Sequence, residues 1–416
     1  MSNEKGEISF VGPGNPPIFP FLGRVNFGII RLDPAGPIAN AVGCAVRGTG
    51  REPPFFRASE HKGIRTMRIT KSVAKLVGYT PGEQPKAKNV IKLNTNENPY
   101  PPSPKCAQVL KSFDLDLLRR YPDPVFTRLR AAIASANRTT PDRVFIGNGS
   151  DEILSIAAKC FVENDEKIAS LDPSYSLYRT LADIRDVEWV GENDVLTKPR
   201  AATDLAKTGV SLFLLTNPNA PTGEMRAPEA IAAFAKRFPG VVIVDEAYAD
   251  FASADCRALA TDPKNRNVIV MRTFSKSYSL AGLRVGYCIG PEDLVAALYK
   301  VKDSYNVDAI AQAVALAAFE DRAYFKATVA RVRKTRRAFC RELAKRGWTF
   351  PATESNFVFA RPPEPLRADE LFAALKTREI FVRYFPGPKT GESLRITIGT
   401  DDQMKALLDA LDGISF

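Results

Sequence analysis

Short apolar runs alternate with polar turns and helical stretches between about Asp142 and Gly290. This alternation predicts an α/β fold, in which the strands form a mostly parallel sheet and crossover helices join them. The predicted strands span residues 143–146, 167–171, 211–215, 241–244, 268–272 and 285–289. Ligands of open α/β sheets bind outside the carboxyl ends of the strands. The residues that follow each strand are therefore the first candidates for a functional site.

The first two predicted strands are followed by residues that suit a phosphate and a flat ring. Residues 147–152, Gly-Asn-Gly-Ser-Asp-Glu, lead into a helix predicted from Ile153 to Phe161. Backbone N–H groups and the positive end of the helix dipole favour an anion there, although a plain helix cap would have the same sequence. Tyr175 follows the second strand, where it can stack on a ligand ring or pack in the core.

The next two strands end in a polar turn and in a carboxylate. Residues 216–223 contain two prolines and a final glycine, which predict a tight turn. Asp245 emerges from a fully apolar strand, and Tyr248 follows it. A buried carboxylate is costly unless it meets a cation or a proton donor, and a protonated ring nitrogen is such a partner.

Lys276 follows the fifth strand in a serine-rich turn, after Thr273 and Ser275 and before Arg284. Taken alone, such a lysine is more often a surface residue of a loop. A lysine held out of bulk water near another cation has a lowered amine pKa, which makes it a nucleophile toward an aldehyde. Arg284 can supply that cation and can also bind a phosphate. The helix start at residues 147–152, the Tyr175 ring, the turn at 216–223, the Asp245 carboxylate and the Lys276 amine would lie at one edge of the sheet. Together they predict a site for pyridoxal 5'-phosphate.

Composition excludes several other kinds of chemistry. The only histidine among 416 residues, His61, lies outside the predicted fold, so Ser-His-Asp, Cys-His and histidine-metal sites are not expected and no metal site is predicted. The six cysteines are scattered without a Cys-x-x-Cys pair, which predicts free thiols in a reducing, cytoplasmic compartment. No apolar run approaches the ~18 residues that a membrane span needs, so no membrane partner is expected.

The net charge of +11 is spread along the chain without a long basic block. Small anionic substrates explain this charge as well as nucleic acid does, and we predict no nucleic-acid partner. The basic run from Arg331 to Arg337 is interpreted as a solvated helix face rather than a binding patch.

Residues 1–66 contain eight prolines and ten glycines but no sustained hydrophobic period. This composition is typical of an unfolded extension. A transit peptide is disfavoured by Glu4 and Glu7. A misplaced start fits better, because Met67 begins a normal amphipathic stretch.

From about Met67 onward, the sequence closely resembles the fold-type-I pyridoxal-phosphate aminotransferases, within them the branch that acts on histidinol phosphate. Seven ordered motifs carry the resemblance: Leu93-Asn-Thr-Asn-Glu-Asn-Pro-Tyr100, Tyr121-Pro-Asp123, Asn217-Pro-Asn-Ala-Pro-Thr-Gly223, Asp245-Glu-Ala-Tyr248, Ser275-Lys-Ser-Tyr-Ser-Leu-Ala-Gly-Leu-Arg284, Tyr305-Asn-Val307 and Leu394-Arg-Ile-Thr-Ile-Gly-Thr400. This resemblance implies a large, mostly parallel cofactor-binding domain and a smaller α+β C-terminal domain. The implied boundaries are an extension at 1–66, an N-terminal arm at 67–120 packing with the small domain, the large domain at 121–325 and the small domain at 326–416.

The resemblance also implies roles for individual residues. Lys276 would be the Schiff-base lysine and the base, Asp245 would keep the pyridine nitrogen protonated, and Tyr248 would bind the phenolic oxygen. Tyr175 would stack on the ring. The phosphate would be held by Ser150, Asp151, Thr273, Ser275 and Arg284, and by Tyr121 from the second subunit of a homodimer. Where relatives carry asparagine this chain has Ala220, so the contact to the oxygen is predicted for Asn219. The predicted substrate-binding residues are Tyr100, Asn356, Arg383 and Arg395.

The expected reaction moves an amino group between histidinol phosphate with 2-oxoglutarate and imidazole-acetol phosphate with glutamate. Arginines pair with phosphates and carboxylates in planar geometry, which suits Arg383 and Arg395 to these anions, although surface salt bridges are the alternative. The same scaffold could serve an aromatic-amino-acid aminotransferase or a threonine-phosphate decarboxylase. A cofactor-binding transcriptional regulator would need a helix-turn-helix segment, which residues 1–66 are too rich in proline and glycine to form. An inactive structural relative would bind no cofactor.

Overall fold

A seven-stranded sheet forms the centre of the structure, a computed structural model that describes residues 69–76, 82–85, 89–193, 195–198 and 200–414. The strand order is β2-β8-β7-β6-β5-β3-β4. Strand β8 runs antiparallel to both its neighbours, and the pairs β7–β6, β6–β5, β5–β3 and β3–β4 are parallel. The strands are β2 Val144–Gly147, β3 Lys167–Leu171, β4 Glu188–Glu192, β5 Val210–Thr216, β6 Val241–Asp245, β7 Val268–Thr273 and β8 Gly286–Ile289.

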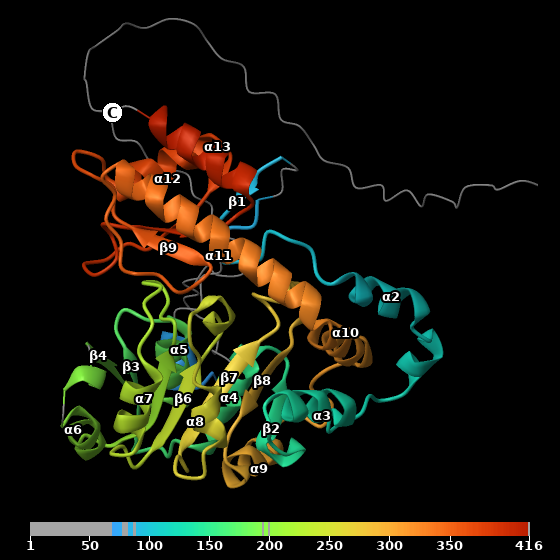
Figure 1. Ribbon diagram of the computed structural model, residues 1–416. Helices are drawn as coiled ribbons and strands as arrows, with labels where there is room; N and C mark the ends of the chain where they lie inside the picture. The colour runs from blue at the N-terminus through green and yellow to red at the C-terminus, as the bar shows by residue number, and fades with distance from the viewer. Residues whose placement is uncertain (1–68, 77–81, 86–88, 194, 199, 415–416) are drawn as a thin grey trace, which may run out of the picture. The chain divides into compact units, whose positions relative to one another are not determined.

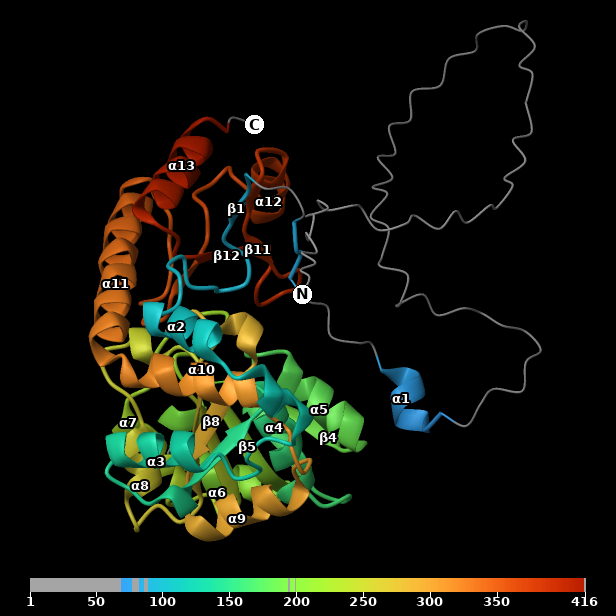
Figure 2. The same cartoon turned by 90° about the vertical axis from the view of Figure 1, so that its right-hand side faces the viewer.

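Helices cover both faces of this sheet, because alternate residues of the buried strands point to opposite sides. One face packs on α4 Ser150–Cys160, α5 Leu177–Arg185 and α9 Glu292–Val301. The other face packs on α3 Thr127–Ala136, α6 Ala201–Lys207, α7 Pro228–Ala235, α8 Arg257–Thr261 and α10 Ala309–Glu320. Figure 1 shows the sheet between these helices, and Figure 2 shows α10 beside α3 and α2 Pro104–Ser112, which it contacts.

A second core lies around a smaller antiparallel sheet of order β11-β12-β9. Its elements are α11 Arg322–Lys345, β9 Phe357–Ala360, α12 Ala368–Thr377, β11 Arg383–Tyr384, β12 Leu394–Thr397 and α13 Asp401–Asp412. The N-terminal strand β1 Ile91–Lys92 pairs in parallel with β10 Ile380–Phe381, and Leu93 is buried in the same core. The remaining short elements are α1 Lys71–Lys75, η2 Leu115–Arg119, η3 Pro141–Arg143, η4 Val195–Thr197, η5 Ala249–Phe251 and η6 Ala281–Leu283.

All six strands predicted for the central sheet are confirmed, each within one residue of its predicted ends. Strand β4 was not predicted, because Glu188-Trp-Val-Gly-Glu192 at the sheet edge has no continuous apolar run. The apolar run Ile380-Phe-Val-Arg383 also predicts a strand from the sequence, and this strand is wrong as a single element. It divides at Val382, since Ile380 and Phe381 pair with β1 whereas Arg383 and Tyr384 pair with β12.

The long helical stretch that the sequence predicts past Ala309 differs from this prediction in two ways. It breaks at Asp321, whose carboxylate caps α11 by accepting from the backbone N–H of Tyr324. The basic run on α11 is not solvated throughout, because Arg336 is buried and donates to the backbone carbonyls of Phe251 and Ser355 at 3.2 and 2.7 Å.

The predictions for residues 1–66, including His61 and Cys44, lie outside the described residues. The five cysteines that the structure describes form no disulfide. Within the described residues, no helix is both long and apolar enough to cross a bilayer. The predicted domain boundaries stay a prediction.

Candidate active site

A cavity of about 680 Å³ opens at the carboxyl ends of the parallel strands. Most of the predicted site residues line it: Ser150, Asp151, Tyr175, Asp245, Tyr248, Thr273, Ser275, Lys276, Arg284, Arg383 and Arg395. These residues come together because Asp245 ends β6, Thr273 ends β7 and Ser150 begins the helix that follows β2. The second sheet supplies Arg383 and Arg395 from the opposite side.

Lys276 is the basic residue that follows β7. Its amine donates to the carbonyl of Thr95 at 3.0 Å and lies 5.8 Å from the centre of the Tyr248 ring. Burial lowers the pKa of the amine to about 8, and the positive charge of Arg395 adds to this effect. Arg284, the neighbour predicted from the sequence, contributes less than Arg395 to the lowered pKa. Near neutral pH, such an amine can give up a proton far more readily than a surface lysine.

Asp245 is the acidic counterpart of Lys276. Its side chain is buried and accepts from the Tyr178 hydroxyl at 3.0 Å and from the backbone N–H of Ala247 at 3.1 Å. Burial raises the pKa of the carboxyl to about 7, although both hydrogen bonds act in the opposite direction. Across the described part of the chain, no cation forms an ion pair with Asp245. A cationic ring nitrogen in the cavity would provide the missing charge.

Tyr248 extends the polar side of the cavity. Its hydroxyl accepts from the amide Nδ2 of Asn96 at 3.0 Å, and its ring packs edge-on against Phe357. Tyr175 also lines the cavity, and its hydroxyl donates to the Asp151 carboxylate at 3.3 Å. The Tyr248 hydroxyl is thereby held by Asn96, and the Tyr175 hydroxyl is held by Asp151.

An anion cradle lies where α4 begins. Gly149 precedes the helix with a left-handed φ of 82°, and no side chain among the described residues caps the N–H groups of the first turn. A Cβ at Gly149 would lie 2.6 Å from Nη2 of Arg284, so only glycine lets this guanidinium come so close to the helix terminus. Ser275 joins the cradle, since its hydroxyl lies 3.4 Å from Nη1 of Arg284 and 3.0 Å from the Thr273 hydroxyl. Backbone donors, hydroxyls and a guanidinium suit a phosphate.

Two arginines lie opposite the cradle in adjacent strands. Arg383 of β11 is the register partner of Arg395 of β12, and both guanidiniums lie near the Phe385 ring, at 5.2 and 5.0 Å from its centre. Arg395 also donates to the carbonyl of Asn94 at 3.0 Å. Two guanidiniums side by side on one wall can hold anionic groups of a substrate.

Four predicted site residues do not line the cavity. The amide of Asn219 is used by its own turn and by the loop that follows β3, since it donates to the Thr222 hydroxyl and the Pro173 carbonyl and accepts from the Ser174 hydroxyl. Tyr100 lies beneath the Arg331 guanidinium, 3.7 Å from the ring centre. Asn356 is fully buried and donates to the carbonyl of Asn96 at 3.0 Å. Tyr121 is 80% exposed and stacks on Tyr305 with ring centres 4.3 Å apart.

The sequence reasoning missed other polar residues at this site. Tyr178 binds both Asp245 and Thr216, and Asn96 binds Tyr248. Arg179 lines the cavity from α5. Tyr178 and Asn96 lie in or beside polar motifs of the sequence, but a linear pattern does not show that the Tyr178 hydroxyl faces Asp245 or that the Asn96 amide faces Tyr248.

Comparison with known proteins agrees with this geometry. The model of the aminotransferase class I and II family matches residues 88–411. Histidinol-phosphate aminotransferase 1 of Nostoc sp. is 41% identical over 82% of this chain and 96% of its own length. Histidinol-phosphate aminotransferase of Syntrophotalea carbinolica is 43% identical over 83% and 99%.

A solved structure shares the fold. The histidinol-phosphate aminotransferase of Sinorhizobium meliloti, crystallised in complex with pyridoxal-5'-phosphate, superposes with a TM-score of 0.75 at 25% identity, over 83% of this chain and 97% of its own. The predicted fold type is therefore confirmed. The lysine of lowered pKa, the buried carboxylate and the anion cradle around one cavity agree with the family match over residues 88–411. The chain therefore belongs to the class I and II aminotransferases.

Proposed function

We propose that the chain uses pyridoxal 5'-phosphate to transfer an amino group between histidinol phosphate and 2-oxoglutarate. The observation that carries this proposal is the convergence of Lys276, Asp245 and the Arg284 cradle on one cavity. The relatives that are 41 and 43% identical along nearly their whole length carry the name of this activity.

The residues around the cavity fit the cofactor. The α4 terminus with Arg284 and Ser275 would hold its phosphate, Asp245 its ring nitrogen, Tyr248 its phenolic oxygen and Lys276 its aldehyde carbon. Bound there, the cofactor supplies an aldehyde that exchanges amino groups and a protonated ring that withdraws electrons. Asn219 is a weaker candidate than the sequence implied, because its amide is already engaged by Pro173 and Ser174 of the loop after β3.

The chain's own groups supply the proton transfers. With a pKa near 8, Nζ of Lys276 would take a proton from the substrate carbon that bears the amino group and would deliver it to the cofactor carbon that receives this group. Asp245 stays anionic beside a cation and so keeps that cation protonated. Tyr178 and Asn96 hold Asp245 and Tyr248 in place by the hydrogen bonds described above.

The two adjacent arginines support an anionic substrate. Arg383 and Arg395 would bind the phosphate of histidinol phosphate and the carboxylates of glutamate and 2-oxoglutarate. The proposal is tested by comparing kcat/KM of the purified protein for histidinol phosphate, phenylalanine, tyrosine and threonine phosphate. We expect histidinol phosphate to be preferred by at least about 100-fold, which corresponds to ~3 kcal/mol of differential binding. Brisk phenylalanine or tyrosine transamination without turnover of histidinol phosphate would contradict the substrate assignment.

We also propose that two copies of the chain form a homodimer in which Tyr121 completes the neighbour's cavity. Tyr121 is exposed and is not among the residues that line the cavity of its own chain. Around it, Leu115, Leu117, Leu118 and Val125 are 71, 46, 51 and 43% exposed, so the segment presents apolar side chains at its surface.

Mixing inactive subunits tests this arrangement. We expect Lys276→Ala and Tyr121→Ala proteins, each of low activity alone, to regain up to about a quarter of wild-type activity when refolded together. If Tyr121 acts on the neighbour, one of the two cavities in each mixed dimer has both residues intact, and about half of randomly paired dimers are mixed. Refolding each variant alone is the control. If activity does not return although mixed dimers form, Tyr121 does not act in the neighbour's cavity.

The cradle makes a separate prediction. Gly149→Ala should weaken cofactor affinity by at least about tenfold, because the new methyl group displaces the Arg284 guanidinium and strains a left-handed backbone position. Gly282→Ala is the matched control, since a Cβ there meets nothing within 4 Å. Titrating each cofactor-free protein with pyridoxal 5'-phosphate and following tryptophan fluorescence measures the affinities. Equal affinities for the two variants would rule out the cradle.

A further inference from the structure

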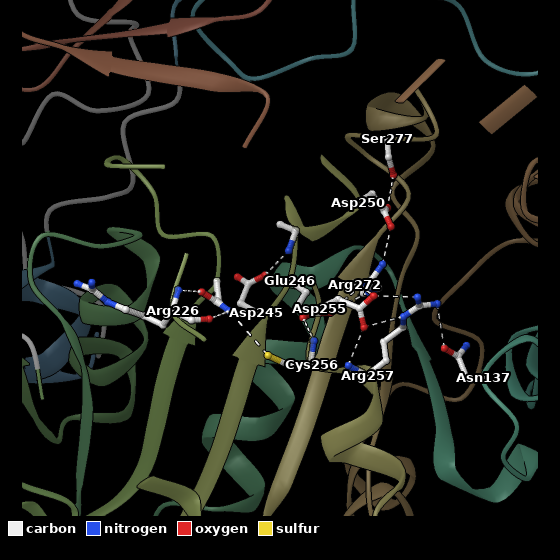
Figure 3. A network of polar contacts seen from close by, with 12 residues as sticks. Asn137, Arg226, Asp245, Glu246, Asp250, Asp255, Cys256, Arg257, Arg272 and Ser277 are labelled. Atoms are coloured by element: carbon white, nitrogen blue, oxygen red, sulfur yellow. Dashed lines mark hydrogen bonds and ion pairs between the residues drawn. The ribbon is translucent and has the colours of Figure 1, made fainter. Parts of the chain in front are cut away.

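Beside the cavity, but not among the residues that line it, lies a cluster of buried charges around Arg272. Arg272 belongs to β7, and its guanidinium donates to Glu246 at 2.7 Å and to Asp250 at 2.5 Å. Asp255 lies 3.4 Å from the same guanidinium. Figure 3 shows Arg272 among these three carboxylates, with Asp250 on the side of Ser277 and Asp255 on the side of Arg257.

This cluster joins the two segments that carry Asp245 and Lys276. Glu246 directly follows Asp245, and Asp250 lies two residues after Tyr248. On the other side, Ser277 directly follows Lys276, and its hydroxyl donates to the second carboxylate oxygen of Asp250 at 2.5 Å. A continuous path of charge-assisted hydrogen bonds therefore runs from Glu246 through Arg272 and Asp250 to Ser277.

Other contacts also hold the segment that carries Lys276, since its amine donates to the carbonyl of Thr95 and the backbone N–H groups of Ser279 and Leu280 donate to the carbonyls of Lys276 and Phe274 at 3.3 and 3.1 Å. The segment after β7 is not part of a strand or an α-helix, and the amide of Asn98 holds the carbonyls of Lys276 and Ser277 at 3.2 Å each. Buried hydrogen bonds to charged groups are short, strong and directional. The Asp250 contact therefore restricts where the backbone of Ser277, and with it the Lys276 side chain, can lie.

We propose that Asp250, itself held by Arg272, is a positioning residue that fixes the Lys276 amine relative to Asp245 and Tyr248 through the Ser277 hydroxyl. The inference rests on the proposed function, because it assigns the chemistry to Lys276. Asp250 and Arg272 act only through other residues, and neither lines the cavity.

Four variants separate positioning from general stability. Ser277→Ala removes one hydroxyl, and Asp250→Ala removes the carboxylate that binds it. Asp250→Asn is the conservative variant, since its oxygen can accept from Arg272 while its Nδ2 donates to the Ser277 oxygen. Asp255→Ala is the matched control, because it removes a carboxylate from the same guanidinium on the side away from Ser277.

Steady-state kinetics of the holoenzymes provides the first readout. We expect kcat of Ser277→Ala and Asp250→Ala to fall about 10- to 100-fold with little change in KM, since a misplaced base slows the reaction more than it weakens substrate binding. The double variant should lose no more than the worse single variant, because both changes break one hydrogen bond. Asp250→Asn should recover most of kcat, and Asp255→Ala should keep it.

Hydrogen exchange of the cofactor-free proteins is the second readout and needs no activity. Residues 274–280 should exchange faster in Ser277→Ala and Asp250→Ala while the sheet strands stay protected, and Asp255→Ala should leave this segment unchanged. Ser277→Ala keeps the test valid if Asp250→Ala does not fold.

The outcomes distinguish this inference from the proposed function. A wild-type holoenzyme that fails to turn over histidinol phosphate contradicts the proposed substrate, and the kinetic comparison is then made with an amino donor that the wild type accepts. A wild-type kcat in Ser277→Ala, or an equal loss of kcat in Asp255→Ala, overturns the positioning role.

Discussion

Replacing Lys276 by alanine is expected to lower kcat by about 10⁴-fold or more, because the variant loses both the nucleophile and the base. Lys276 is the one amine of lowered pKa that lines the cavity, among the residues described. The measurement is the single-turnover rate with saturating cofactor and histidinol phosphate. Adding a small primary amine such as methylamine should restore part of the rate, since it can replace the missing base in the space left by the side chain. No loss of rate in the alanine variant would remove Lys276 from the mechanism.

The unfolding free energy of a Lys276 variant tests the burial of the amine independently of activity. The pKa of the Lys276 amine is lowered from 10.5 to about 8, so the buried amine opposes folding below pH 8, and this penalty disappears as the pH rises above about 10.5. Without cofactor, Lys276→Met should therefore unfold with a free energy higher by up to about 3 kcal/mol at pH 7. The difference should shrink toward pH 10.5. Urea unfolding at several pH values measures this difference in unfolding free energy. A Lys276→Met variant that is less stable than the wild type at pH 7 would contradict a destabilising, buried Lys276 amine.

Asp245→Asn should give the second largest loss, about 10²- to 10³-fold in kcat. The amide cannot neutralise a cationic ring nitrogen, and removing one partner of a buried pair typically costs ~3–5 kcal/mol. The loss of kcat should persist at saturating cofactor, which separates it from weaker cofactor binding. Asp245→Glu keeps the charge and should retain more activity than the amide variant.

The cofactor-free form of Asp245→Asn should be more stable than the wild type at pH 8. The folded-state pKa of the carboxyl is raised from 3.8 to about 7, so wild-type stability falls as the pH rises from about 4 to 7, whereas the amide does not titrate. Below pH 4 the two proteins should unfold with similar free energies. Full activity of Asp245→Asn would contradict the proposed role of this carboxylate. A variant that is less stable than the wild type at pH 8 would contradict the raised pKa of the Asp245 carboxyl.

Much of the site follows from the sequence because parallel strands end at one edge of a sheet. Asp245, Thr273 and the Gly149 turn each come directly after an apolar run, so their approximate positions are fixed once the strands are recognised. Residues of the second sheet were harder to place, because no local pattern reports on packing between distant segments. The cation that most lowers the pKa of Lys276 is Arg395 of β12 and not the nearby Arg284, and this depends on how the two sheets pack.

Side-chain direction was the other limit of the sequence analysis. Asn219 has the correct residue type in the correct turn, but its amide bonds to Pro173 and Ser174 of the neighbouring loop and leaves the cavity wall to Ala220 and Pro221. Conversely, Tyr178 reads as a core aromatic, and its hydroxyl nevertheless holds Asp245. The charge cluster around Arg272 was also missed, since its members are separated in the chain and meet only in the folded protein.

The central claim is that this cavity lets Lys276 and a bound aldehyde cofactor exchange an amino group with histidinol phosphate. The most direct test mixes the purified holoenzyme with histidinol phosphate in the absence of any keto acid and follows the visible absorbance of the cofactor. We predict that the band of the aldehyde form is lost with release of one keto product per site, and that 2-oxoglutarate restores it with formation of glutamate. An unchanged spectrum with no keto product would contradict the account.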